Sequence, residues 1–106
     1  MSIFAVIREA GPAWRVGGIY EQPAVGEHAA FMNTLADEGF LLFAGPLAGT
    51  EQGRVRVLLI ANAEDEAGIQ RRLAEDPWVT SEQLVVASIE PRQIIVGTER
   101  LASPRV

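Results

Sequence analysis

The sequence contains no cysteine and no lysine, and it has one histidine, His28. Without cysteine, a disulfide framework, a thiolate metal site and a cysteine nucleophile are all excluded. Without lysine, Schiff-base chemistry and lysine-dependent phosphate sites are excluded. One subunit cannot build a zinc site from several histidines, and any catalytic histidine has to be His28. Few side chains are therefore available for chemistry.

Positive charge is also scarce. Fourteen acidic residues outnumber nine basic ones, all of them arginine, and the net charge is −5. An acidic domain without a basic stripe is a poor match to nucleic acid, because that binding depends on neutralising phosphates. The same argument counts against anionic membrane surfaces. We therefore expect neither nucleic acid nor a membrane as a partner.

Long apolar runs are absent as well. No stretch approaches the ~20 residues that span a bilayer, and the first apolar stretch lacks the basic region of a signal peptide. We therefore expect a cytoplasmic protein. The 106 residues, 48% of them hydrophobic and 22% charged, fit one globular domain over 1–106. We expect its last segment, 97–106, to be a loosely held tail.

Short apolar runs rich in β-branched residues predict four strands. The predicted strands cover residues 3–8, 40–44, 54–61 and 84–89. Glu90-Pro91 is expected to interrupt the last strand before an extended segment over 93–96.

Two helices separate these strands. Helical apolar spacing covers 24–38, with Pro23 suited to the first turn and Gly39 as the stop. Asn62 is expected to cap the second helix, which ends near Asp76 because a proline follows. The order is βαββαβ, so we predict an α+β, ferredoxin-like antiparallel sheet with both helices on one face.

Three of the strands are apolar on both faces. An antiparallel strand with one wet face should alternate between apolar and polar residues. A second subunit covering the open face of the sheet resolves this, and we predict a homodimer packed sheet to sheet.

His28 and Asp76 are the leading candidates for chemistry. His28 lies on the inner side of the first helix, where it is either a buried neutral histidine or a general acid/base. Asp76 is either a turn aspartate or a carboxylate that orients an imidazole.

Three further features have two interpretations each. Gly45-Pro46 is either a turn or a pocket wall. Ser88, on one face of the fourth strand, is either polar lining of a pocket or part of a solvent-facing rim. Trp14 and Tyr20 either pack over an opening or seal the loop that holds them.

Three segments taken together resemble the YCII-related (YciI-like) family. They are Glu27-His28-Ala-Ala-Phe31-Met32-x-x-Leu35-x-x-x-Gly39, Phe43-Ala-Gly45-Pro46-Leu47 and Asp76-Pro77-Trp78. The resemblance spans roughly residues 3–96 and implies a dimeric α+β barrel with a His–Asp site at His28 and Asp76. One family member is a dehydrochlorinase of a chlorinated hydroxyhydroquinone, and related barrels include muconolactone isomerases.

The sequence departs from the family pattern at one arginine. Many members carry an arginine shortly before the histidine, whereas the nearest upstream arginine here is Arg15. If that arginine binds an anionic substrate in relatives, the role is lost or has moved to Arg15.

The expected helix directions set a further condition on the His–Asp pair. We expect the two helices to run roughly parallel, with His28 beginning one and Asp76 ending the other. A helix of about 12 residues is ~18 Å long. The two side chains then meet through the loop after Pro77, across a dimer, or not at all.

The hypothesis is a dimeric lyase or isomerase with a pocket between the first helix and the sheet. His28 is the general base or acid, Asp76 orients it, and a small organic ring compound is the substrate. No residue requires a cofactor or a metal. The alternative is a non-catalytic small-molecule-binding or structural homodimer. A histidine that opens onto a cavity and bonds to a carboxylate favours catalysis.

Overall fold

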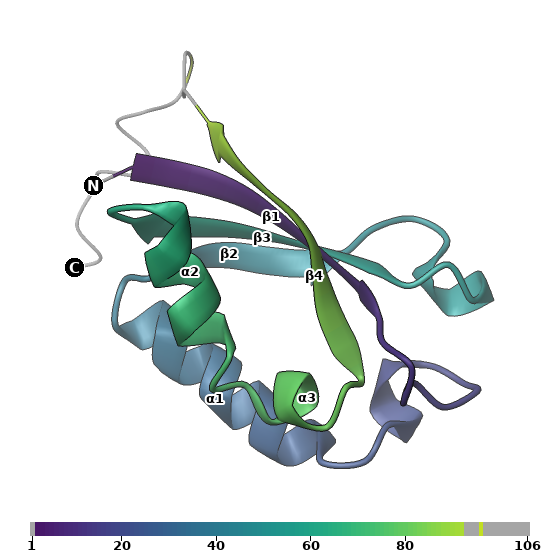
Figure 1. Ribbon diagram of the computed structural model, residues 1–106. Coiled ribbons are helices and arrows are strands. Elements are labelled where there is room, and N and C mark those ends of the chain that lie inside the picture. Colours follow the sequence, from purple (N-terminus) through teal and green to yellow (C-terminus); the bar gives the residue numbers. More distant parts are fainter. Residues whose placement is uncertain (1, 93–95, 97–106) are drawn as a thin grey trace.

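The computed structural model describes residues 2–92 and residue 96 of the chain (Figure 1). The α-helices and strands are, in chain order, β1 (Ser2–Ala10), α1 (Val25–Asp37), β2 (Leu41–Pro46), β3 (Arg56–Ala63), α2 (Glu66–Leu73), α3 (Pro77–Thr80) and β4 (Leu84–Arg92). The predicted βαββαβ order is confirmed, with the short α3 added before β4. The predicted tail over 97–106 lies outside the described residues, as do 93–95 of the predicted extended segment.

The four strands form one sheet in the order β2-β3-β1-β4. Each neighbouring pair is antiparallel, with Val6 of β1 opposite Leu59 of β3 and Ile89 of β4. The three helices all lie on one face of this sheet (Figure 1). This is the ferredoxin-like fold, so the predicted fold class is confirmed.

The helix directions differ from the expectation. α1 follows β1 and α2 follows β3, and these two strands are antiparallel. Each helix returns against the strand before it, so α1 and α2 run in opposite directions (Figure 1). The expectation of parallel helices was wrong because it left out the opposed directions of β1 and β3. The segment after α2 therefore reaches the beginning of α1, and α3 packs against α1.

The core fills the space between the sheet and the helices. Its buried members are Phe4, Val6, Leu35, Leu41, Leu59, Ala61, Ala63, Ile69 and Leu73. A smaller cluster of Val55, Trp78 and Leu84 lies nearer to α3 and the loop after β1, and Trp14 packs against it. Together the two clusters hold α1 and α3 against the sheet.

Three local expectations need correction. Pro23 precedes α1, which begins at Val25 after Ala24 adopts a left-handed φ of 60°. Asn62 belongs to β3, and Asp65 caps α2 by accepting from the Gly68 N–H. β4 continues through Pro91, opposite Phe4, because an edge strand tolerates a missing N–H.

Among residues 2–92 and 96, no helix lies on the other face of the sheet (Figure 1). In β1 and β3 this face presents Ile3, Ala5, Ile7, Leu58 and Ile60, all partly exposed. Among the described residues, none of the helices has the length and hydrophobicity to cross a membrane.

Candidate functional site

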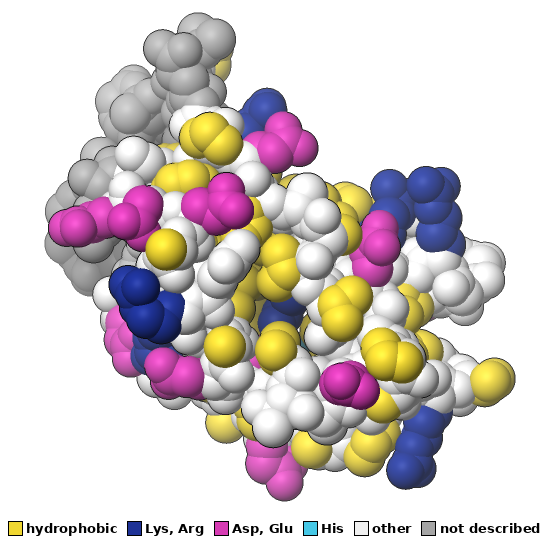
Figure 2. Space-filling model, in the orientation of Figure 1, with side chains coloured by type: hydrophobic (Ala, Val, Ile, Leu, Met, Phe, Trp, Pro, Cys, Tyr) yellow, Lys and Arg dark blue, Asp and Glu magenta, His cyan; other side chains and the backbone are white. Residues whose placement is uncertain are grey.

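A cavity of about 340 Å³ lies between α1, β1 and the edge strand β2. Its lining is mostly apolar and consists of Arg8, Ile19, His28, Met32, Asn33, Ala36, Leu41, Phe43, Ala44, Gly45, Val57 and Leu84. Figure 2 faces the opposite edge of the sheet, at β4, where hydrophobic side chains also gather around a hollow between the sheet and the helices, with basic atoms at its floor. The volume is at the small end of the range for ligand pockets, and a few polar groups in an apolar wall are typical of them.

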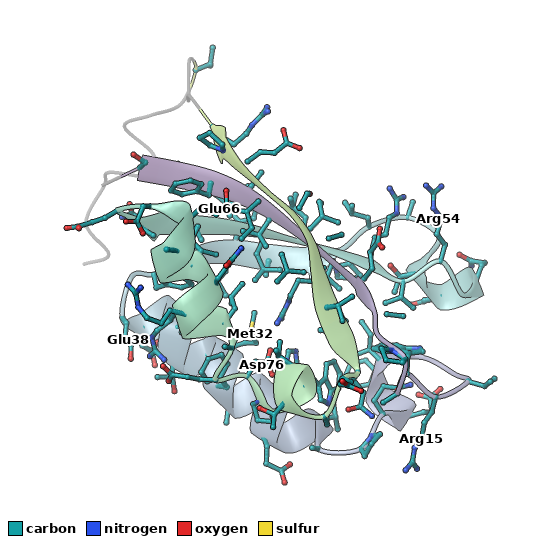
Figure 3. All side chains as sticks on the ribbon, viewed as in Figure 1. Arg15, Met32, Glu38, Arg54, Glu66 and Asp76 are labelled. Carbon is teal, nitrogen blue, oxygen red and sulfur yellow. The ribbon has the colours of Figure 1, made fainter. Side chains whose placement is uncertain are left out.

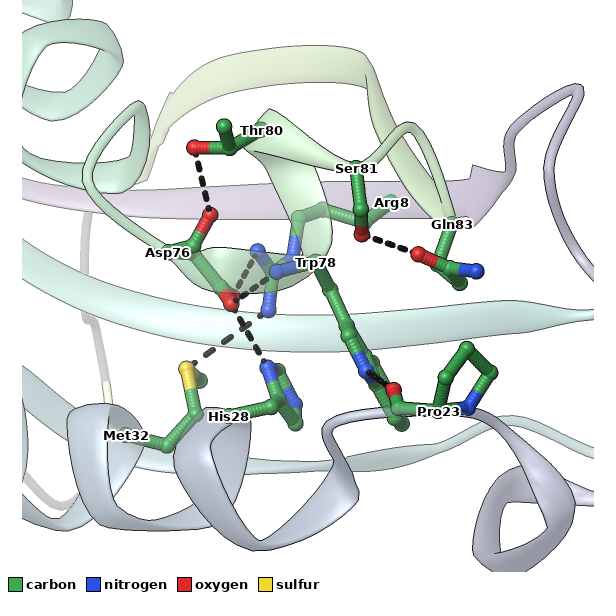
Figure 4. Close-up of polar contacts among 9 residues, drawn as sticks. All are labelled: Arg8, Pro23, His28, Met32, Asp76, Trp78, Thr80, Ser81 and Gln83. Atoms are coloured by element: carbon green, nitrogen blue, oxygen red, sulfur yellow. Dashed lines mark hydrogen bonds and ion pairs between the residues drawn. The ribbon is translucent and has the colours of Figure 1, made fainter.

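His28 and Asp76 meet within one subunit. His28 Nδ1 lies 2.8 Å from Asp76 Oδ1, and the close-up in Figure 4 shows α1 presenting the ring toward the carboxylate. The Asp76 side chain is fully buried, whereas the His28 side chain keeps 14% exposure. The histidine therefore links a buried carboxylate to the cavity.

The local sequence explains the position of Asp76. It is the N-cap of α3, and its Oδ1 accepts the Trp78 N–H at 2.9 Å. Asp followed by Pro is a strong start signal, because aspartate caps and proline suits the first helical position. The same two residues were expected to end the previous helix. α2 instead ends at Leu73.

Asp76 also accepts a hydrogen bond from Arg8, whose Nη1 lies 2.8 Å from Oδ2. Burial by itself raises the pKa of Asp76, but the hydrogen bonds from His28, Arg8 and the Trp78 N–H outweigh it and lower that pKa below 3.8. The carboxylate is therefore ionised at neutral pH. An ionised carboxylate only accepts hydrogen bonds, so Nδ1 of His28 carries a proton. In the neutral imidazole, Nε2 is then the unprotonated nitrogen and is able to act as a base.

Trp78 fixes the plane of the imidazole. The two rings are stacked, with centroids 3.9 Å apart and planes 7° from parallel. Trp78 is itself held by its Nε1–H, which donates to the Pro23 carbonyl at 2.7 Å. Trp14 packs edge-on against Trp78, with centroids 5.8 Å apart. The imidazole is therefore oriented from one side by a carboxylate and from another by an indole.

Arg8 was not among the site residues predicted from the sequence, although it contacts Asp76 and lines the cavity. It lies on β1 at the same two-residue period as Phe4 and Val6, and like them it is buried. A charged residue on the buried face of a strand is rare without a partner. That periodicity was the available signal, and Asp76, 68 residues away, is the partner.

Of the other residues predicted to bind substrate, one lines the cavity and three lie elsewhere. Gly45 lines the cavity, whereas Pro46 lines a neighbouring hollow with Tyr20 and Thr50. Arg15 is exposed on the loop after β1 and points away from the cavity (Figure 3). Ser88 lies opposite Ile7, so it belongs to the sheet face opposite the three helices.

The two loop aromatics also differ from each other. Trp14 seals the loop by packing against Trp78, whereas Tyr20 is 86% exposed. Within residues 2–92 and 96, no group of three or more His, Cys, Asp or Glu side chains is placed to hold a metal ion.

Among solved structures, the chain is similar to a 5-chloro-2-hydroxyhydroquinone dehydrochlorinase from Burkholderia phenoliruptrix, in complex with 2,5-dihydroxybenzoquinone. The TM-score is 0.53 at 19% sequence identity, and the match covers 92% of this chain and 97% of that chain. At this identity the likeness establishes the fold. No protein-family model and no curated protein matches the chain.

Proposed function

We propose that this chain is a YciI-like enzyme that acts on a small ring compound by proton transfer at His28. In this proposal His28 is the general base or acid, and Asp76 orients it and balances its charge. The reaction is an elimination or an isomerisation, and the chemistry assigned to the pair invokes no cofactor.

One observation carries the proposal. A mostly buried histidine faces a cavity, and its Nδ1 is bonded at 2.8 Å to a buried carboxylate. In the proposed step a substrate C–H or O–H bond breaks, the proton goes to Nε2, and the electron pair stays on the substrate. The imidazolium that forms is stabilised by Asp76, which stays ionised.

The structural neighbour supports the size and kind of substrate. Its name describes loss of HCl from a chlorinated, hydroxylated ring, and elimination of this kind needs a group that accepts a proton. The cavity of about 340 Å³ suits a compound of one or two rings.

The test is turnover of a panel of lactones and halogenated phenols by the wild-type protein and by His28→Asn. The side-chain amide of Asn is not a base, so we expect the rate to fall by roughly 10²–10⁴-fold. Glu27→Gln, an exposed neighbour on α1, is the matched control and should keep the wild-type rate. Turnover unchanged in His28→Asn would remove the general-base role. Binding of panel compounds without turnover by the wild-type protein would instead favour the non-catalytic binding dimer.

The proposal includes a homodimer. The strands carry apolar residues on both faces of the sheet. The face opposite the helices nevertheless leaves apolar side chains partly exposed, namely Ile3, Ala5, Ile7, Leu58 and Ile60. A second copy placed sheet to sheet buries this face of each subunit, and a twofold arrangement makes the patch complementary to itself.

A further inference from the structure

Arg8 places a permanent positive charge at the wall of the cavity. Its side chain has 0% exposure, and it lines the cavity together with His28 and Met32. Arginine stays protonated in proteins, so burial cannot neutralise it. The charge must be matched by groups around it.

The hydrogen bonds of Arg8 are only partly satisfied. Nη1 donates to Asp76 at 2.8 Å, and Nη2 faces Met32 Sδ at 3.6 Å, a weak acceptor. The buried Nε has no hydrogen-bond partner among the described residues. A buried donor without an acceptor destabilises the protein, and a charged donor does so more strongly. The guanidinium therefore has unused capacity for an acceptor.

The charge balance of the cluster formed by Arg8, Asp76 and His28 also favours an anionic ligand. Among the described residues, Asp76 is the one carboxylate bonded to both Arg8 and His28. With His28 neutral, the cluster has no net charge. Once His28 takes a proton, the cluster carries one positive charge that no described residue in the cavity lining offsets, because no acidic side chain belongs to that lining.

We infer that the cavity selects small organic anions, and that an ionised ligand oxygen (phenolate, enolate or carboxylate) accepts a hydrogen bond from the Arg8 guanidinium. This inference rests on the site named in the proposed function and adds its substrate class. Arg8 is then the specificity-determining residue. A hydrogen bond between two charged groups is stronger than a neutral one, and the apolar walls around it screen it little.

The same contact assists the proposed proton transfer. When a C–H bond beside a ring carbonyl breaks, the proton moves to Nε2 of His28 and the electron pair delocalises onto the carbonyl oxygen. That oxygen then carries the negative charge, and a guanidinium beside it stabilises the product of the transfer more than the reactant.

The inference is tested by binding rather than by turnover. Isothermal titration calorimetry compares two matched pairs of ligands at neutral pH: 2,5-dihydroxybenzoquinone with its dimethyl ether, and benzoate with benzamide. We expect the wild-type protein to bind the anion at least ~10-fold more tightly than the neutral partner in one pair or both. No preference for the anion in either pair would overturn the inference.

Substitutions then assign the preference to Arg8. Arg8→Gln should remove it, and Arg8→Lys, which keeps the charge without the planar fork, should retain part of it. Arg15→Gln removes an exposed arginine and should leave the preference intact. A preference that survives in folded Arg8→Gln would overturn the assignment. If Arg8→Gln is recovered unfolded, as judged by circular dichroism, the preference for the anion is compared between Arg8→Lys and Arg15→Gln. An equal preference in these two variants would overturn the assignment.

His28→Asn separates this inference from the proposed function. It keeps Arg8, so the preference for the anion should persist even though turnover is lost. Loss of the preference in folded His28→Asn would show that the charge of His28, and not Arg8, selects the ligand. Unchanged turnover together with a retained preference would instead overturn the general-base role alone.

Discussion

Asp76 accepts hydrogen bonds from three parts of the chain. Arg8 comes from β1, His28 from α1, and the Trp78 N–H from the first turn of α3. One carboxylate therefore caps a helix, neutralises a buried arginine and fixes the proton of an imidazole. Changes at this residue are expected to affect stability as well as activity.

Asp76→Asn should lower the free energy of unfolding by about 3–5 kcal/mol, because it leaves the charge of Arg8 buried without a counter-ion. Urea unfolding followed by circular dichroism measures the change. Glu75→Gln is the matched control, since Glu75 pairs with Arg72 at the surface and such pairs contribute at most about 1 kcal/mol. Equal costs for the two variants would contradict the buried role of Asp76.

The stability that Asp76 provides should depend on pH. Its pKa in the folded protein is below the ordinary value of 3.8, so the unfolded chain takes up the proton first as the pH falls. The contribution is complete above the unfolded value and is lost as the pH drops through the folded one. The charged or titratable groups that face Asp76 are Arg8 from β1 and His28 from α1.

Unfolding curves for wild type and Asp76→Asn at a series of pH values test this dependence. The difference in unfolding free energy between the two should be constant from neutral pH down to about pH 5, then shrink as the medium becomes more acidic. A difference that stays constant to the lowest pH at which the protein folds would show that ionisation of Asp76 contributes nothing.

Among the secondary-structure elements, the opposite directions of α1 and α2 bring His28 and Asp76 together. Because β1 and β3 are antiparallel, the helices that follow them are antiparallel too, and α3 begins beside the first turns of α1. Asp76 and Pro77 then start a new helix at this position. The His–Asp contact therefore depends on the order of the strands as much as on the two residues.

Gly39 follows the C-cap of α1 with a φ of +82°, and a Cβ added there would meet nothing within 4 Å. Gly39→Ala should therefore destabilise the fold by about 1–2 kcal/mol through backbone strain alone. Gly26 of α1 also has open space around it but no positive φ, so Gly26→Ala should be neutral or stabilise by up to ~1 kcal/mol. Thermal unfolding of the two variants makes the comparison, and a loss of equal size in both would contradict the explanation.

At the scale of the whole molecule, the uncovered sheet face should decide the assembly. We expect the wild-type protein to sediment as a dimer and Leu58→Glu to sediment as a monomer, because a charge buried in an apolar interface is costly. Val16→Glu, on a fully exposed loop residue, should remain a dimer. A wild-type monomer at micromolar concentration in analytical ultracentrifugation would contradict the proposed homodimer.

Much of the fold follows from local patterns in the sequence. The apolar runs predict all four strands, and Gly39 marks the end of α1, because burial and turn chemistry act over a few residues. The positions that were wrong are boundaries where two local signals compete. Asn62 is a possible cap but remains paired in β3, and Pro91 stays in β4 because that strand is at the sheet edge.

The element order and the fold class were predictable from local sequence patterns, and the single histidine left one choice for a catalytic imidazole. Which groups meet depends on the tertiary fold. Asp76 is 48 residues from His28 and 68 from Arg8, and contacts at such separations depend on strand order and helix direction. The role of Arg8 depends on which face of β1 is covered, and packing of the helices against the sheet sets that face.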